Sequence, residues 1–113
     1  MSKLAPIVLF CYNRPNHVKL TIASLKNNHL ANQSSLYIFL DGPKSKKDFI
    51  KNKEVFDYIS KISGFAKIQI YRRKKNLGLA MSIISGINFV LKKNDKIIVV
   101  EDDIVTSPFF LKF

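Results

Sequence analysis

The sequence predicts an α/β fold, a three-layer sandwich in which a mostly parallel sheet lies between helices. Two observations support this. Four short apolar runs alternate along the chain with longer stretches of helical periodicity, and every apolar run ends in polar residues. Crossovers of this length join parallel strands, and they are right-handed in nearly all proteins. The expected order is β-α-β-α-β-α-β and the start of another helix, which is half of a doubly wound domain.

The expected strands are apolar and lack the alternation of a half-exposed strand. They cover residues 7–12, 36–40, 66–71 and 97–100. A strand that is apolar at successive positions is typical of a parallel sheet covered on both faces. We therefore expect the last of them, Ile97 to Val100, to be buried on both faces before the chain emerges at three acids.

The expected helices each have one apolar face. Pro15 suits the first helical turn and Asn13 is placed to cap that helix, which we expect to reach about Asn27. Its apolar face is formed by Val18, Ile22 and Leu25.

The second expected helix follows a lysine-rich loop that contains Lys44, Lys46 and Lys47, and it stops near Gly64. Its apolar positions are Phe49, Phe56, Ile59 and Ile62. The third covers 79–92, with Ala80, Ile83, Ile84, Ile87 and Leu91 on one face.

Composition indicates a single globular domain with a strongly basic balance. The 113 residues have hydrophobic content of 47% and a net charge of +11. Such a charge attracts polyanions, although a solvated basic surface would have the same composition. The chain has no signal-peptide layout and no apolar run of transmembrane length. The single Cys11 lies in an apolar run, as expected of a reduced thiol in a cytoplasmic protein, and association with the inner face of the membrane is compatible with the sequence.

Polar residues follow all four expected strands. They are Asn13-Arg14, Asp41-Gly42, Arg72 to Asn76, and Glu101-Asp102-Asp103. The carboxyl ends of parallel strands share one edge of the sheet, where open α/β sheets bind their ligands. Cations, carboxylates and helix N-termini at one edge suit a nucleotide diphosphate with Mg²⁺ or Mn²⁺. Alternation along the last strand puts Glu101 and Asp103 on one side and Asp102 on the other, so these three acids need not all be metal ligands.

These segments together resemble a known family. Cys11-Tyr12-Asn13-Arg14-Pro15, Leu40-Asp41-Gly42, Asn76 to Ala80 and Val99 to Asp103 look like nucleotide-sugar-dependent glycosyltransferases of the GT-A fold. The front half is similar to the bacterial family 2 type. The acidic segment, continuing through Ser107-Pro108-Phe109-Phe110, is similar to the N-acetylglucosaminyltransferase I group. The resemblance covers essentially the whole chain, in the expected order.

The resemblance implies a metal-dependent glycosyltransferase that moves a sugar from a nucleotide-diphosphate donor, UDP-linked, to a glycan or lipid-linked glycan. Asp103 would bind the Mn²⁺ or Mg²⁺ ion. Asp102 would contact the ribose, and Glu101 the ribose or donor sugar. Asp41 would accept a hydrogen bond from uracil. The remaining expected donor contacts are Tyr12, which would pack against the base, Asn13, Arg14, Asn76 and Gly78.

Each assignment has a structural competitor. Tyr12 is also explained as a core aromatic, Asp41 as a turn residue before Gly42-Pro43, and Gly78 as a tight strand-to-helix turn. The basic run 72–75 is more typical of a solvated loop than of a phosphate clamp.

Other classes of function fit less well. No Gly-x-Gly-x-x-Gly follows the first strand, which disfavours a dinucleotide-binding dehydrogenase. A phosphoacceptor receiver domain needs clustered acids after the first strand, whereas here they follow the fourth. The main alternative is a basic, non-catalytic module that binds nucleic acid or another polyanion. This alternative leaves the acidic triplet Glu101-Asp102-Asp103 unexplained. The glycosyltransferase hypothesis, in contrast, expects no nucleic-acid partner.

The chain stops at Phe113, a few residues into an expected helix. We expect residues 1–113 to be the N-terminal, nucleotide-sugar-binding part of a truncated glycosyltransferase domain. The resemblance places the catalytic base and acceptor site in the missing half. On this hypothesis the chain has no catalytic residue beyond the metal site, and by itself it binds a donor but is inactive in transfer.

Overall fold

The computed structural model describes residues 4–102 and confirms the α/β fold. Four parallel strands form one sheet in the order β3-β2-β1-β4. The strands are β1 (Ile7–Cys11), β2 (Ser35–Leu40), β3 (Lys67–Arg72) and β4 (Ile98–Glu101). The helices are α1 (Pro15–Lys26), α2 (Lys46–Ile59) and α3 (Leu79–Leu91), with a short 3₁₀ turn at Ala31–Gln33. The last expected helix, after Ser107, lies outside the described residues.

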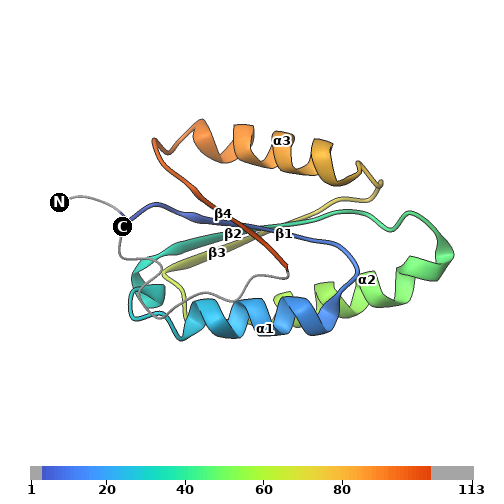
Figure 1. Cartoon of the computed structure of the whole chain (residues 1–113), viewed down its shortest axis with the longest axis horizontal. Helices are drawn as coiled ribbons and strands as arrows, with labels where there is room; N and C mark the ends of the chain where they lie inside the picture. The colour runs from blue at the N-terminus through green and yellow to red at the C-terminus, as the bar shows by residue number, and fades with distance from the viewer. Residues whose placement is uncertain (1–3, 103–113) are drawn as a thin grey trace.

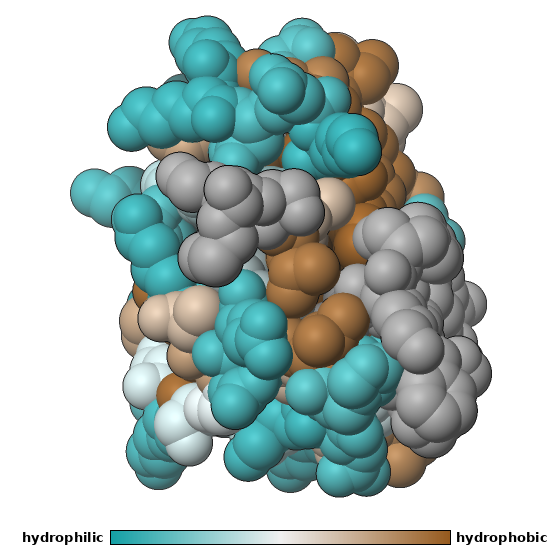
Figure 2. Space-filling view, turned by 90° about the vertical axis from the view of Figure 1, so that its left-hand side faces the viewer, coloured by the Kyte–Doolittle hydropathy of each residue, from teal (hydrophilic) through white to brown (hydrophobic). Residues whose placement is uncertain are grey.

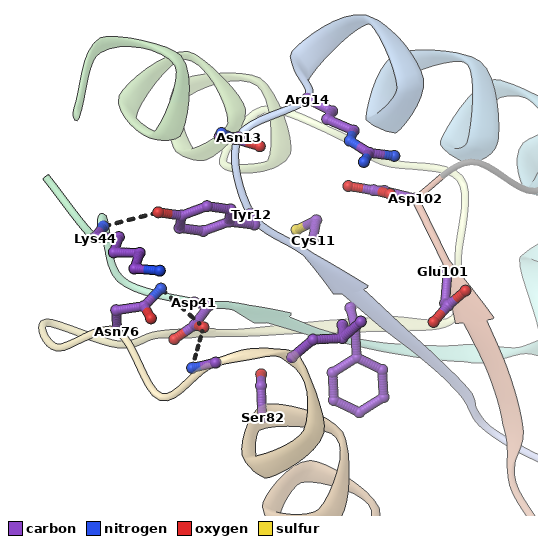
Figure 3. A pocket seen from close by; sticks show the side chains of 13 residues that line it. Cys11, Tyr12, Asn13, Arg14, Asp41, Lys44, Asn76, Ser82, Glu101 and Asp102 are labelled. Atoms are coloured by element: carbon purple, nitrogen blue, oxygen red, sulfur yellow. Dashed lines mark hydrogen bonds between the residues drawn. The ribbon is translucent and has the colours of Figure 1, made fainter. Parts of the chain in front are cut away.

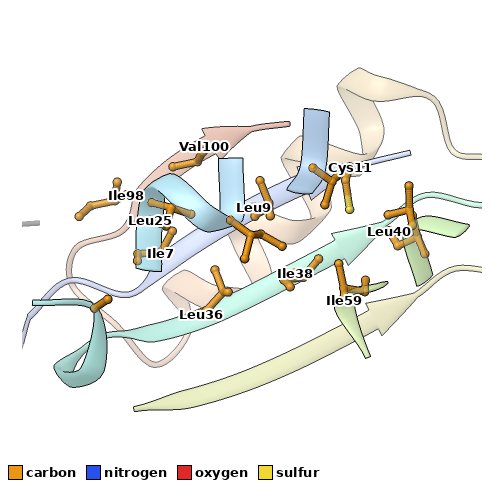
Figure 4. Close-up of a cluster of buried hydrophobic side chains, with 14 residues drawn as sticks. Ile7, Leu9, Cys11, Leu25, Leu36, Ile38, Leu40, Ile59, Ile98 and Val100 are labelled. Carbon is orange, nitrogen blue, oxygen red and sulfur yellow. The ribbon is translucent and has the colours of Figure 1, made fainter. Parts of the chain in front are cut away.

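The helices cover opposite faces of the sheet. In Figure 1, α1 and α2 lie below the sheet and α3 lies above it. Successive side chains of β1 point to opposite faces, which divides the core into two clusters. Ile7, Leu9 and Cys11 pack on the α1/α2 side, which is the larger cluster (Figure 4), and Val8 and Phe10 pack on the α3 side. The result is a three-layer arrangement, compatible with a Rossmann-like sandwich.

The α3 layer depends on a close approach between helix and sheet. Gly86 faces the sheet, and a Cβ atom built on it would lie 2.6 Å from Cε1 of Phe10 and 3.2 Å from Cδ2 of Phe39. The Phe39 ring stacks on Phe10 at 5.5 Å and on Tyr71 at 4.8 Å between ring centroids. A side chain at position 86 would therefore have to push α3 away from this aromatic row.

The prediction of which residues form the buried face of α3 is wrong in part. Its buried residues are Ser82, Gly86 and Val90, whereas Ile84 is 52% exposed and Leu91 is also exposed. Small residues lie against the aromatic rings because space there is short, while the larger apolar residues lie to the side. A choice based on hydrophobicity alone favours the larger residues.

The second helix also differs from the expectation. It ends at Ile59, five residues before Gly64, and Phe49 is 51% exposed. The buried positions are Asn52, Val55 and Ile59, spaced i, i+3 and i+7. The buried stripe of α2 thus begins with a polar residue, which a search for apolar periodicity passes over.

The expectation that the last strand is buried on both faces is wrong. In β4, Ile98 and Val100 are buried, but Val99 is 40% exposed. Among the described residues β4 pairs only with β1, and α3 packs over the β1–β3 side of the sheet. β3, at the other edge, is only partly buried as well.

The surface of the described chain has both hydrophilic and hydrophobic side chains. Figure 2 views the molecule from the side on which the strands begin, and hydrophilic residues cover much of it with hydrophobic residues exposed between them. None of the helices within residues 4–102 has the length and apolar character needed to cross a membrane.

Candidate functional site

A pocket of about 470 Å³ lies at the carboxyl edge of the sheet. All eight residues expected to contact a nucleotide sugar line it (Figure 3). They are Tyr12, Asn13, Arg14, Asp41, Asn76, Gly78, Glu101 and Asp102. The strand order reverses between β1 and β4, which is where open α/β sheets form their ligand crevice. The volume is in the range of small-molecule sites. The ligand roles of these residues stay predictions.

The wall that follows β1 is held by a hydrogen-bond network with α2. The Tyr12 hydroxyl donates to Oδ2 of Asp48 at 2.9 Å and accepts from the Lys44 backbone N–H at 2.7 Å. The Asn13 amide donates to Oδ1 of Asp48 at 2.9 Å. Desolvation raises the pKa of Tyr12, and the hydrogen bonds from Tyr12 and Asn13 lower the pKa of Asp48. Tyr12 is thus a tethered pocket residue, only partly buried.

The expected capping role of Asn13 is wrong. Helix α1 begins at Pro15 as expected, but its N-cap is Arg14, without a side-chain capping bond. The Asn13 side chain is bonded to Asp48 instead, because the chain leaving β1 passes beside α2 before it turns into α1.

The floor of the pocket is organised by Asp41, which is only 5% exposed. Its Oδ1 accepts from the backbone N–H groups of Gly42 and Leu77, both at 2.9 Å. Its Oδ2 accepts from the Gly78 N–H at 3.0 Å and from the Asn76 amide at 3.3 Å. A carboxylate offers about four acceptor positions, and all four are in use. A hydrogen bond from uracil to this carboxylate would require one of these bonds to open.

Two glycines permit this arrangement. Gly78 has a φ of 82°, a conformation that L-residues with a side chain rarely adopt, and it is the N-cap of α3. Gly42 lies against the main chain of the following loop, since a Cβ atom there would be 2.6 Å from the carbonyl carbon of Lys75. The Asn76 amide also donates to the Gly42 carbonyl at 2.9 Å. The N-terminus of α3 is thereby held at the pocket.

The acidic wall is formed by the end of β4. Glu101 is exposed and continues the face of Val99, while Asp102 lies on the α1 side, where the buried Thr21 hydroxyl donates to its carbonyl oxygen at 2.8 Å. Figure 3 shows the side chains of Asp102 and Arg14 pointing toward one another. Burial, and secondarily the charge of Asp102, raise the pKa of the Cys11 thiol, so it stays protonated. The expected metal ligand, Asp103, lies outside the described residues.

The described carboxylates at the pocket could supply only part of the coordination shell of a divalent ion. Within residues 4–102 no group of three or more His, Cys, Asp or Glu side chains could enclose a metal. Mg²⁺ and Mn²⁺ often take one or two protein carboxylates and complete their shell with phosphate and water oxygens. The Asp41 oxygens are used by the protein, and the other described carboxylates at the pocket are Glu101, which is exposed, and Asp102, whose side chain points toward Arg14 (Figure 3).

The basic run 72–75 does not line the pocket. The Arg72 guanidinium lies 4.0 Å from the centre of the Phe56 ring, and Nη2 of Arg73 donates to the Ser85 hydroxyl at 2.8 Å. Lys74 and Lys75 are exposed. The positively charged residues at the pocket are Arg14 and Lys44.

Sequence reasoning missed several residues of the site. Lys44, Ser82 and Phe10 also line the pocket. Cys11 and Leu79, which lie within the segments that carry the resemblance, line it as well. Asp48 and Asn52 hold its wall from behind. A signal for Asn52 was present, because it is a polar residue at a core position of the helical stripe that includes Val55 and Ile59. No sequence pattern indicates that Asp48 bonds Tyr12.

A scan against protein-family models finds no family that matches this chain, and a search of curated proteins finds no match either.

Proposed function

We propose that this chain is the donor-binding portion of a metal-dependent glycosyltransferase. It binds a nucleotide-diphosphate sugar, UDP-linked, whose sugar is transferred to a hydroxyl of a glycan or lipid-linked glycan. The main support is the convergence of eight residues from four separate segments on one pocket at the reversal of strand order. The sequence predicts these same eight residues as the donor contacts.

The pocket has the complementary chemistry for a diphosphate. Arg14 and Lys44 supply positive charge, and the N-terminus of α3 supplies the backbone N–H groups that follow Gly78, whose own N–H is bonded to Asp41. Helix N-termini favour phosphate because their first N–H groups have no partner within the helix and the helix dipole is positive there. Tyr12 adds an aromatic side chain with a fixed hydroxyl.

The acidic wall supports a metal-dependent donor. Glu101 and Asp102 approach the pocket from the strand opposite Asp41, so a cation there would lie between protein carboxylates and a bound diphosphate. A divalent ion at this position would neutralise the charge that develops on the departing nucleoside diphosphate. Asp103, next in the sequence, is the expected main ligand.

Isothermal titration calorimetry tests the proposal. UDP is titrated into the native chain with MnCl₂ and, separately, with excess chelator. Asp102→Asn and Asp103→Asn are compared with Asp95→Asn, which removes one exposed charge from the turn before β4. We expect metal-dependent binding that Asp103→Asn abolishes, that Asp102→Asn weakens and that Asp95→Asn leaves unchanged. Equal binding with and without chelator would contradict the proposed metal role, and no binding under any condition would contradict the donor-binding function.

The alternative hypothesis, a basic polyanion-binding module, makes a different prediction. Random-sequence RNA should then bind with an affinity that falls steeply as salt rises, and the acid-to-amide variants should bind it at least as well as the native chain. A titration with RNA over a range of salt concentrations separates the two functions.

A further inference from the structure

Two polar residues of α2 lie one turn apart behind the pocket without lining it. Asp48 and Asn52, spaced i and i+4, face the chain that leaves β1. Asp48 lies in the first turn of α2 and is half-buried, whereas Asn52 is 1% exposed. Both side chains form hydrogen bonds to the segments that form the pocket.

Asn52 holds main chain. Its amide nitrogen donates to the carbonyl of Tyr12 at 2.9 Å and to the carbonyl of Asp41 at 2.8 Å. A side-chain amide has two N–H donors, so both are used. The ends of β1 and β2 are therefore fixed relative to one another and to α2, whatever the side chains of the pocket do.

Asp48 holds side chains. Its Oδ2 accepts from the Tyr12 hydroxyl and its Oδ1 from the Asn13 amide, both at 2.9 Å, and Ser45 is a further hydrogen-bonding partner of the carboxylate. The Tyr12 hydroxyl in turn accepts from the Lys44 N–H. Because the hydroxyl both donates and accepts, the ring is held in one orientation. Loss of the carboxylate would leave Tyr12 and Asn13 free to change rotamer while Asn52 keeps the main chain in place.

We infer that Asp48 is a positioning residue that orients Tyr12 and Asn13 in the pocket, and that it determines ligand affinity without touching the ligand. This inference depends on the proposed donor-binding function for its ligand. Asp48 could instead only stabilise α2, because an acid in the first turn interacts favourably with the helix dipole. In that case the effect of Asp48 would not pass through Tyr12.

The test compares Asp48→Ala, Tyr12→Phe, their double variant and Asp57→Ala. Tyr12→Phe removes only the hydroxyl and leaves the helix acid in place. Asp57→Ala removes the same charge from an exposed position of α2. Calorimetry measures binding of UDP with MnCl₂, and ¹⁵N-resolved NMR of the unliganded chain follows the Lys44 amide proton, whose resonance reports its bond to the Tyr12 hydroxyl.

We expect Asp48→Ala to weaken UDP binding about tenfold, the effect of losing a hydrogen bond to a charged group, and Asp57→Ala to leave binding unchanged. Tyr12→Phe defines the Lys44 resonance without the hydroxyl, and Asp48→Ala should move it toward that value. The double variant should bind UDP more tightly than the product of the two single effects predicts, because Asp48 acts in part through Tyr12.

Unchanged UDP affinity in Asp48→Ala would overturn the inference, and so would independent effects of Asp48→Ala and Tyr12→Phe. If the native chain binds no UDP, the proposed function fails, and the Lys44 resonance alone then decides the inference. A shift toward the Tyr12→Phe value in Asp48→Ala supports the positioning role, and an unchanged resonance contradicts it.

Discussion

The two sides of the pocket are built in different ways. One side, here called the first wall, comprises the segment after β1 and the Asp41 floor after β2. It is tied to α2 and to the loop before α3 by side-chain hydrogen bonds, and the central groups are Asp41, Asp48 and Asn52. The acidic wall follows an edge strand, and its clearest anchor is the bond from Thr21 to the Asp102 carbonyl. The first wall uses the carboxylates of Asp41 and Asp48 to hold the protein, and the acidic wall presents the exposed carboxylate of Glu101 at the pocket.

This difference teaches that carboxylates at neighbouring strand ends need not have the same task. The Asp41 oxygens are filled by four protein donors, so Asp41 organises the pocket. Glu101 is exposed at the end of β4, as suits a group that meets a cation or a sugar hydroxyl. Substitution of Asp41 should therefore chiefly change stability, whereas substitution of Glu101 should change metal-dependent binding.

The largest effect is expected at Asp41. Asp41→Ala should lower the free energy of unfolding by about 3 kcal/mol, because the N–H groups of Gly42, Leu77 and Gly78 lose a charged, buried acceptor. Urea unfolding followed by circular dichroism measures this, with Asp57→Ala as the exposed control. A loss below about 0.5 kcal/mol, the size of an ordinary surface change, would contradict the organising role of Asp41.

The next effect concerns Gly78 and has a matched control. Gly78→Ala should cost about 1–2 kcal/mol because position 78 has a φ of 82°. Gly64 has a φ of 99° away from the pocket, so Gly64→Ala should cost a similar amount. Only Gly78→Ala should also weaken UDP binding in calorimetry, since it disturbs the N-terminus of α3. Equal UDP affinity of the two variants would show that this terminus is not part of the site.

A smaller change in stability is expected at the acidic wall. Thr21→Val keeps the shape of the side chain but removes the bond to the Asp102 carbonyl, at a cost of about 1 kcal/mol. Ser60→Ala removes a hydroxyl bond of 2.7 Å to the Phe56 carbonyl on α2 and serves as control. Thr21→Val, but not Ser60→Ala, should weaken UDP binding in the presence of Mn²⁺. If both variants bind as the native chain does, the position of the β4 end does not control the site.

The smallest effect is a pH dependence of the first wall. The hydrogen bonds from Tyr12 and Asn13 lower the pKa of Asp48 below its ordinary value of 3.8, so their stabilising contribution is complete above that pH. It is lost as the pH falls through the lowered pKa of the folded state. The difference in urea midpoint between native protein and Asp48→Ala should be constant from pH 5 to 8 and shrink toward pH 3. If the difference in urea midpoint grew as the pH falls, it would contradict a lowered pKa of Asp48 in the folded state.

Much of the fold was predictable because it depends on patterns that the sequence displays. All four strands lie within one residue of the expected bounds at each end. Val18, Ile22 and Leu25 are buried as expected. The sharing of one pocket by the predicted residues followed from parallel strands, since their carboxyl ends meet at one edge.

What was not predictable depends on contacts between segments far apart in the chain. Gly86 and Ser82 face the sheet because the Phe10 and Phe39 rings occupy the space, and a helical pattern taken alone favours the larger Ile84. The use of Asn13 by Asp48 instead of by α1 is a tertiary contact over 35 positions. The exposure of Val99 follows from the edge position of β4 in the described sheet, which strand composition does not reveal.

The most direct test of the donor pocket is a ¹⁵N-resolved NMR titration of the native chain with UDP and Mg²⁺, a diamagnetic ion. Our account predicts that the largest amide shifts fall on Tyr12 to Arg14, on Asn76 to Leu79 and on Glu101–Asp102, the segments that line the pocket. Chelation of Mg²⁺ should reduce them. Shifts concentrated instead on the lysine-rich end of α3, at Lys92 and Lys93, or the absence of any shift, would contradict a nucleotide-sugar site in this pocket.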